Sequence, residues 1–334
     1  MFWYNQLVKL NNFVKIFKIM VRVFFFFAAI IFLTGSCRDP VKESYRIATL
    51  KGPSSMGMIY LIDSLAGNEN FNTHVDILDE PIQVRKMMLE GTADFAILPT
   101  TMAAIIYNKG LDYKLIAIPV WGTLYLFGSD STIVSWNDLK NKRVHVMARG
   151  MTPDVLFRNL LLKNGIVPES DITLDYSFPT HIDLANAVAA GRAELGVISE
   201  PLVSLVMDKN RNVHPVFDLN FEWKKMNGIP MAQTSFLVKS SLIEENPELV
   251  EKVIKGYENS TRKVNADPHN AADLIVRYGI LPARDVAVQS IPRSNLNFIR
   301  ANKIETEIND YLGVFYDMNP DIIGGRLPDE DFIY

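Results

Sequence analysis

Short apolar runs alternate with amphipathic stretches along most of this chain. Residues 46–50 and 143–148 are largely apolar, a composition typical of buried strands. Each run is followed by a basic residue and a glycine, and then by apolar positions three or four residues apart. This spacing predicts amphipathic helices at about 55–65 and 153–163. Strands that alternate with helices predict an α/β fold, with parallel sheets covered by helices on both faces.

An internal repeat with a period of one hundred residues predicts two lobes of the same construction. Residues 88–98 match residues 188–198, because both contain the end of a helix, a glycine cap and a short buried strand. Gly91 of the first segment corresponds to Gly191 of the second. The repeat therefore predicts two Rossmann-like lobes. The alternative is a chance similarity, in which the same landmarks recur in the same order by accident.

Two further apolar runs predict the connections between the lobes. Residues 121–127 are expected to form a strand that leaves the first lobe, and residues 232–238 a strand that returns to it. The predicted boundaries place lobe 1 at 45–124 plus 235–334 and lobe 2 at 125–234. Three helices are expected to complete lobe 1, at 247–260, 268–278 and 295–312. Two α/β lobes joined by two crossing strands form a cleft. The carboxyl ends of the strands and the N-termini of the helices face into this cleft.

Cys37, the only cysteine in 334 residues, follows a segment typical of a secretory signal peptide. Lys18 and Arg22 precede an apolar run over 23–33. That run is too short to cross a hydrocarbon core of about 30 Å. Residues 1–36 are therefore interpreted as the signal peptide, and Cys37 looks like the lipidation site of a bacterial lipoprotein. The alternative is a free cysteine after an ordinary signal peptide.

Two segments beside this signal need separate interpretations. Residues 1–19 are either an upstream extension from a misplaced start, because a complete signal begins at Met20, or an unusually long basic region. Residues 37–44 are short, charged and contain Pro40. They are expected to form a lipidated tether between the membrane and the folded body.

Charge and histidine placement argue against several function classes. The net charge is −4, and basic and acidic residues are interspersed without a basic patch, so we expect no nucleic-acid partner. The five histidines are scattered without zinc-site spacing, and no Gly-x-Ser-x-Gly motif occurs. We therefore expect no catalytic residue, no metal and no cofactor. We also expect a monomer. An enzyme on the same fold remains the less favoured alternative.

Several short motifs along the chain recur in one known family. They lie at 50–53, 91, 94–101, 107–110, 122–125, 138–140, 199–201 and 324–328. On these motifs the chain resembles the substrate-binding proteins of ABC transporters, in the branch that handles nitrate, sulfonates, taurine and thiamine-precursor pyrimidines. The resemblance implies the type 2 periplasmic binding protein fold, a small-molecule ligand, and permease and ATPase partners. It also implies a place in the cell envelope, facing the periplasm or the exterior. The pyrimidine-binding members carry a cysteine-rich site motif, which this chain lacks.

Loops that are expected to meet in the cleft contain the candidate ligand-binding residues. In lobe 1 these are Lys51, Gly52, Pro53, Ser54, Ser55, Thr100, Thr101, Trp121, Gly122 and Thr123. In lobe 2 they are Arg149, Gly150, Met151, Thr152, Glu200 and Trp223, with Glu222 beside Trp223 at the rim. Glycine lets backbone N–H groups approach a ligand, and helix N-termini favour anions.

Each candidate also has an explanation that needs no ligand. Ser54 or Ser55 can serve only as a helix cap, and Trp121 can be a packed hinge residue in place of a stacking surface. Arg149 can pair with an anion or point to solvent. Glu200 is expected to receive an amine, an amidine or a ring N–H, unless it is a solvated acid at a helix start.

The binding free energies that are required favour an organic ligand over a bare inorganic anion. A helix terminus contributes roughly 0.3–2 kcal/mol, whereas micromolar affinity requires about 8 kcal/mol. Hydroxyl donors and apolar or aromatic contacts must therefore supply most of the binding energy. The leading hypothesis is a lipid-anchored capture protein for an ABC importer. The alternative is a lipoprotein that senses the same kind of ligand for a membrane receptor.

Overall fold

The structure, a computed structural model of the chain, describes Met20, residues 44–67 and residues 73–334. Ser44–Tyr334 form one compact unit. Cys37, the tether up to residue 43 and the signal peptide apart from Met20 lie outside the described residues. Within the described part of the chain, no helix has both the length and the apolar character needed to span a bilayer.

The first sheet has the strand order β11-β4-β10-β3-β1-β2. Its strands are β1 (Tyr45–Leu50), β2 (Thr73–Leu78), β3 (Phe95–Pro99), β4 (Tyr113–Val120), β10 (Thr234–Lys239) and β11 (Leu296–Arg300). β1 runs parallel to β2 and β3, whereas β10 is antiparallel to β3 and β4. β11 is antiparallel to β4 at the edge of the sheet.

The second sheet has the strand order β7-β6-β8-β5-β9. Its strands are β5 (Leu124–Gly128), β6 (Arg143–His145), β7 (Thr173–Asp175), β8 (Leu195–Ser199) and β9 (His214–Asp218). β6 is parallel to β7 and β8, and β5 is antiparallel to β8 and β9.

The expectation of parallel sheets holds for β1 to β3 and for β6 to β8, but not for the remaining strands. Parallel pairs arise where a helix connects two strands of one sheet, as between β1 and β2. β5 and β10 instead follow a crossing of the chain from the other sheet, and each runs antiparallel to its neighbours. The crossing strands thus convert both sheets into mixed sheets.

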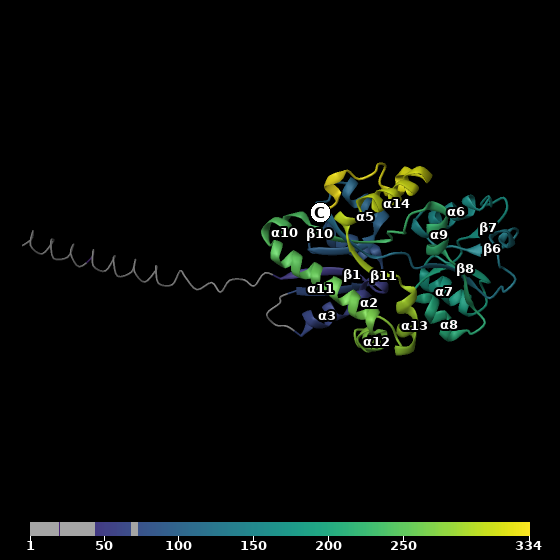
Figure 1. Cartoon of the computed structure of the whole chain (residues 1–334), viewed down its shortest axis with the longest axis horizontal. Helices are drawn as coiled ribbons and strands as arrows, with labels where there is room; N and C mark the ends of the chain where they lie inside the picture. Colours follow the sequence, from purple (N-terminus) through teal and green to yellow (C-terminus); the bar gives the residue numbers. More distant parts are fainter. Residues whose placement is uncertain (1–19, 21–43, 68–72) are drawn as a thin grey trace, which may run out of the picture. The chain divides into compact units, whose positions relative to one another are not determined.

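The helices pack around the two sheets as Figure 1 shows. Those that pack with the first sheet are α2 (Pro53–Gly57), α3 (Ile59–Ala66), α4 (Pro81–Leu89), α5 (Thr100–Asn108), α10 (Ser240–Glu245), α11 (Pro247–Ala266), α12 (Pro268–Arg277), α13 (Arg284–Arg293) and α14 (Glu305–Met318). Those that pack with the second are α6 (Thr152–Lys163), α7 (His181–Ala189), α8 (Leu202–Lys209) and α9 (Leu219–Asn227). Short 3-10 helices lie at Trp136–Leu139, Ala301–Lys303, Pro320–Ile323 and Glu330–Phe332. Below, lobe 1 means the first sheet with its helices, and lobe 2 means the second sheet with its helices.

Most predicted helices are confirmed, and one is wrong. The helix expected at 153–163 is α6, and the one expected at 55–65 is divided at Met58 into α2 and α3. The helix expected at 295–312 contains β11, and α14 begins only at Glu305. The reason is tertiary, because Leu296 pairs with Val120 and completes the edge of the first sheet.

The internal repeat is confirmed in its geometry. α4 and α7 end one hundred residues apart, and β3 and β8 begin one hundred residues apart. Gly91 and Gly191 both have a φ of 68°. This left-handed conformation suits glycine after the last turn of a helix. The same local solution therefore ends the corresponding helix in each lobe.

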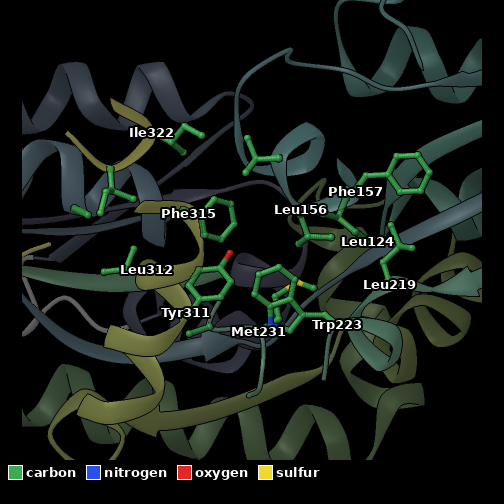
Figure 2. Packing of buried hydrophobic residues seen from close by; sticks show 14 of the residues in the cluster. Leu124, Leu156, Phe157, Leu219, Trp223, Met231, Tyr311, Leu312, Phe315 and Ile322 are labelled. Carbon is green, nitrogen blue, oxygen red and sulfur yellow. The ribbon is translucent and has the colours of Figure 1, made fainter. Parts of the chain in front are cut away.

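The hydrophobic core explains why the lobes lie against each other. One face of the first sheet packs against α3, α11 and α12 through residues such as Phe95 and Phe236. The core on its other face includes Phe315 of α14 and continues into lobe 2 through Leu156 and Trp223 (Figure 2). The apolar cluster thus continues from lobe 1 into lobe 2. Below, the contact between the two lobes is called the seam.

Candidate functional site

Two helix N-termini from opposite lobes meet at the seam. Thr101, the second residue of α5, and Thr152, the first residue of α6, lie with their Oγ1 atoms 2.7 Å apart. Both side chains are buried. The first turn of a helix has backbone N–H groups without intrahelical partners, and its dipole favours negative charge. The seam therefore brings together two hydroxyls and two helix ends that suit an anionic or acceptor-bearing group.

The Gly52 loop lies against lobe 2, and the Ser55 side chain pairs with Gly52 inside the loop. A Cβ atom on Gly52 would lie 3.4 Å from Cδ of Pro201, which follows β8. The Ser55 hydroxyl accepts from the Gly52 N–H at 3.1 Å and donates to the Gly52 carbonyl at 3.0 Å. Pro53 is the first residue of α2, and Lys51 is exposed. The structure thus favours the capping explanation for Ser55.

Replacing Ser55 by alanine should lower the free energy of unfolding by about 1 kcal/mol, because α2 loses its cap. Urea unfolding of the two proteins measures this difference. The exposed Ser131 provides the matched control, since Ser131→Ala removes a hydroxyl without removing a cap. An unchanged unfolding midpoint for Ser55→Ala would contradict the capping role.

The first crossing segment, 121–123, is held by hydrogen bonds to distant parts of the chain. Trp121 Nε1 donates to the Asn297 carbonyl at 2.6 Å, and the Thr123 N–H donates to Gln233 Oε1 at 2.7 Å. The Gly122 carbonyl accepts from the side-chain amide of Asn295. Trp121 is therefore buried and hydrogen-bonded within the protein, which agrees with its alternative explanation as a packed residue.

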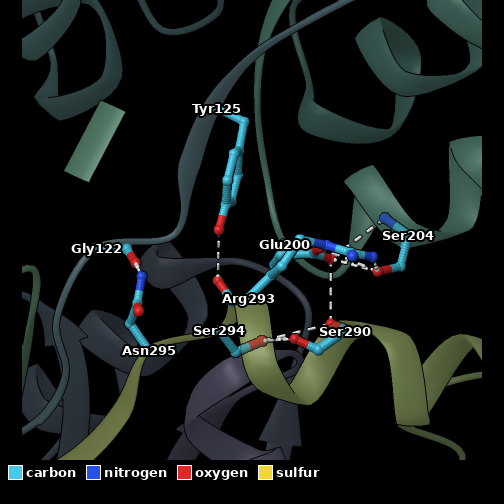
Figure 3. Close-up of polar contacts among 8 residues, drawn as sticks. All are labelled: Gly122, Tyr125, Glu200, Ser204, Ser290, Arg293, Ser294 and Asn295. Atoms are coloured by element: carbon cyan, nitrogen blue, oxygen red, sulfur yellow. Dashed lines mark hydrogen bonds and ion pairs between the residues drawn. The ribbon is translucent and has the colours of Figure 1, made fainter. Parts of the chain in front are cut away.

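Figure 3 shows where Glu200 is placed. Its buried carboxylate accepts from Arg293 Nε at 2.5 Å and from the Ser290 hydroxyl at 3.1 Å. The hydroxyl of Ser204, in the first turn of α8, lies within hydrogen-bond distance of both oxygens and shares its proton between them. Burial raises the pKa of Glu200, against the opposing effects of Arg293 and Ser204. Glu200 comes from lobe 2 and Arg293 from lobe 1, so this is an ion pair across the seam. The expectation of a carboxylate open to a ligand is corrected, because protein donors occupy both oxygens.

The loop before α6 is more exposed than the threonine pair. Arg149 and Met151 are exposed, and the Arg149 guanidinium lies 5.3 Å from the ring centroid of Tyr176. The Gly150 N–H donates to Asp154 Oδ2 at 2.7 Å. Arg149 thus already has an aromatic partner on its own lobe.

Trp223 lies in the core, so its expected place at the rim is corrected. Its side chain is fully buried, with its ring centroid 5.7 Å from that of Tyr311 and 6.0 Å from that of Phe315. Glu222, expected beside it at the rim, accepts from Trp136 Nε1 at 2.9 Å. The aromatic contact joins α9 of lobe 2 to α14 of lobe 1.

Sequence reasoning missed the lobe 1 residues that face this seam from the C-terminal helices. Tyr311 and Phe315 are four residues apart on α14 and therefore share a helix face. That spacing was the only local signal for them. Arg293 carries no such signal, because only the fold brings it to Glu200. Thr100, also a candidate, accepts from the Ser235 hydroxyl at 3.0 Å.

Comparison with known proteins agrees with this architecture. The model of the family described as NMT1/THI5 like matches residues 72–271. Among curated proteins, none matches the chain. A solved structure of an ABC transporter from Parabacteroides distasonis is 25% identical, with a TM-score of 0.75 over 87% of this chain and 98% of that one.

Two further solved structures share the fold at lower identity. The periplasmic aliphatic sulphonate binding protein SsuA from Escherichia coli is 16% identical, with a TM-score of 0.68 over 86% of this chain and 92% of that one. The periplasmic nitrate-binding protein NrtA from Synechocystis PCC 6803 is 11% identical, with a TM-score of 0.59 over 84% of each chain. These likenesses confirm the predicted fold class of two α/β lobes joined by crossing strands.

Proposed function

Because the chain belongs to the NMT1/THI5-like family, we propose that it is the solute-binding component of an ABC importer. It captures a small organic ligand between lobe 1 and lobe 2, and the closed form then docks on a membrane permease that an ATPase drives. Lipid on Cys37 anchors the protein outside the cytoplasmic membrane, beside that permease.

The observation that carries this proposal is the threonine pair across the seam. Thr101 and Thr152 begin helices of different lobes, and their hydroxyls are 2.7 Å apart. A ligand acceptor that replaces this direct contact receives donors from both lobes at once. It is therefore bound more tightly by the closed arrangement than by an open one, which is what drives closure in a binding protein.

The proposed closing movement has its hinge in the two crossings. Lobe 1, proposed as residues 45–124 plus 235–334, and lobe 2, residues 125–234, move as bodies about 121–123 and 228–233. The first crossing contains Gly122, and Gln233 of the second bonds to Thr123 of the first. This short link keeps the two crossings together while the lobes change their angle.

The ligand is proposed to be organic because the seam is both polar and aromatic. Helix termini contribute roughly 0.3–2 kcal/mol each, so two of them fall short of the about 8 kcal/mol that micromolar binding requires. Trp223, Tyr311 and Phe315 supply apolar area at the same seam, where α14 packs against α5 and α6. An anionic or acceptor-bearing head on an apolar body uses both parts of the seam.

A thermal-shift screen of a soluble chain beginning at Arg38 tests the proposal. The panel contains aliphatic sulfonates, nitrate, phosphonates, thiamine precursors, other pyrimidines and flavin-like rings. A ligand at one hundred times its dissociation constant should stabilise the protein by about 2.7 kcal/mol, a shift of several degrees. The double variant Thr101→Val, Thr152→Val should lose that shift. A shift that survives in the double variant would place the ligand elsewhere, and the absence of any shift would argue against solute capture.

A further inference from the structure

Two buried hydrogen-bond donors at the seam have no partner in the described part of the chain. They are Nε1 of Trp223 and the hydroxyl of Tyr311. Both side chains are 0% exposed. Buried polar groups are almost always paired, and an unpaired donor costs free energy. Two such donors in one aromatic contact therefore call for an explanation.

The two side chains come from opposite lobes, and their rings lie in contact. Trp223 belongs to α9 and Tyr311 to α14, and their ring centroids are 5.7 Å apart. Figure 2 shows the Tyr311 hydroxyl directed to the side on which Phe315, Leu156 and Trp223 lie. The contact exists only while the lobes are together.

The same region contains the threonine pair. α14 packs against both α5 and α6, and α6 packs against α9. Leu156 lies one turn beyond Thr152 on α6, so the two residues share a helix face. Four helices thus meet at one seam. It contains the first turns of α5 and α6, with Thr101 and Thr152, and the unpaired aromatic donors.

The chemistry of the two donors restricts what can pair with them. An indole N–H only donates, so its partner is an acceptor. Burial raises the pKa of Tyr311, so the phenol keeps its proton and can donate as well. Phe315, Leu156 and Met231 surround the pair with apolar surface. The partner is therefore a molecule with acceptor atoms in an otherwise apolar body.

Building on the proposed function, we propose that Trp223 and Tyr311 are specificity-determining donors for the captured ligand. The ligand carries an oxyanion for the threonine pair and a second acceptor, such as a ring ether, a carbonyl or a ring nitrogen, for the aromatic donors. A plain alkyl anion leaves both donors unpaired and binds more weakly. A ligand that offers an acceptor to each donor also links the two lobes in the closed form.

The first arm of the test needs no ligand. Tyr311→Phe removes an unpaired hydroxyl and should leave the unfolding midpoint unchanged or raise it. Tyr257→Phe is the matched control, because the equally buried Tyr257 donates to the Ser54 carbonyl at 2.8 Å. Its midpoint should fall by about 2–4 °C. An equal fall for Tyr311→Phe would show that its hydroxyl is already paired and would overturn the inference.

The second arm compares two probes by isothermal titration calorimetry. MOPS carries a sulfonate and a ring ether oxygen, and 3-(piperidin-1-yl)propane-1-sulfonate has a methylene in place of that oxygen. Wild type should prefer MOPS by about tenfold, and Tyr311→Phe should remove most of that preference. Trp223→Phe should also reduce the preference for MOPS. Trp121→Phe is the control, because the Trp121 indole donates to the Asn297 carbonyl, and this variant should keep the preference.

The outcomes separate this inference from the proposed function. The inference alone would be overturned if wild type bound the two probes with equal affinity. It would also be overturned if Tyr311→Phe and Trp223→Phe bound any panel ligand as tightly as wild type. A wild-type protein that binds neither the probes nor any panel member would overturn the proposed function.

Discussion

Replacing Arg293 by methionine is expected to lower the free energy of unfolding by roughly 3 kcal/mol at neutral pH. The Glu200 carboxylate is fully buried and pairs with Arg293 Nε at 2.5 Å. Removing the guanidinium leaves an acid that must either stay ionised without a cation or take up a proton, and both are costly. Urea unfolding at pH 7 measures the loss. Because the pair joins the lobes, ligand affinity should fall as well.

Two controls isolate the buried charge as the cause. Arg284, on the same helix, pairs with Asp273 at 2.8 Å, but both side chains are exposed. Arg284→Met should therefore cost less than about 1 kcal/mol. The double variant Arg293→Met, Glu200→Gln should recover much of the loss, because no buried charge remains unpaired. Equal costs for the Arg284 and Arg293 variants would contradict this account.

The Arg293 variant should also depend on pH in a defined direction. Burial raises the pKa of Glu200 in the folded protein, so protonation of this carboxyl favours the folded state. Its contribution to stability is complete below the ordinary glutamate pKa of 4.5 and is lost as the pH rises through the folded value. Without Arg293 the folded pKa rises further. The deficit of Arg293→Met should therefore shrink as the pH is lowered from 7 towards 4.

Replacing Gly122 by alanine is expected to cost about 3 kcal/mol of stability and to weaken ligand binding. Gly122 has a φ of 102°, which residues with a side chain rarely adopt. An added Cβ would also lie 2.6 Å from Oδ1 of Asn220 in lobe 2. The segment lies in the first crossing, so relief of this contact changes the angle at which the lobes meet. Urea unfolding and titration of a panel ligand measure the two effects.

Gly91→Ala is the matched control for the backbone strain alone. Gly91 also has a positive φ, of 68°, but nothing lies within 4 Å of an added Cβ. Gly91→Ala should lower the free energy of unfolding by about 1–2 kcal/mol and leave ligand affinity unchanged. If both glycine variants lost the same stability and kept the same affinity, the contact with Asn220 would carry no weight at the hinge.

Local patterns were sufficient where an element is stabilised by its own sequence. α6 follows from the proline near its start and its apolar spacing, and the glycine-capped ends of α4 and α7 follow from the repeat. The segment at 295–312 failed because β11 exists through its pairing with β4, which lies far away in the sequence. No local spacing records such a partner.

The candidate site residues also divide into those that local sequence predicts and those that depend on distant partners. The hydroxyls at helix starts could be recognised from the sequence, because Thr101 and Thr152 follow strand or loop signals with a helix after them. Whether a side chain there is paired depends on the fold. Ser55 bonds to its own loop, and Trp121 bonds to Asn297, which is 176 residues away.

By itself, the sequence determined the two-lobed α/β fold, the repeat within it and the threonines at the helix starts, because these depend on local spacing and turn chemistry. Only the tertiary structure decided which side chains meet at the seam. It paired Glu200 with Arg293, brought Thr101 to Thr152, and buried Trp223 against Tyr311. Those contacts join residues of different lobes, and they form only when the lobes pack together.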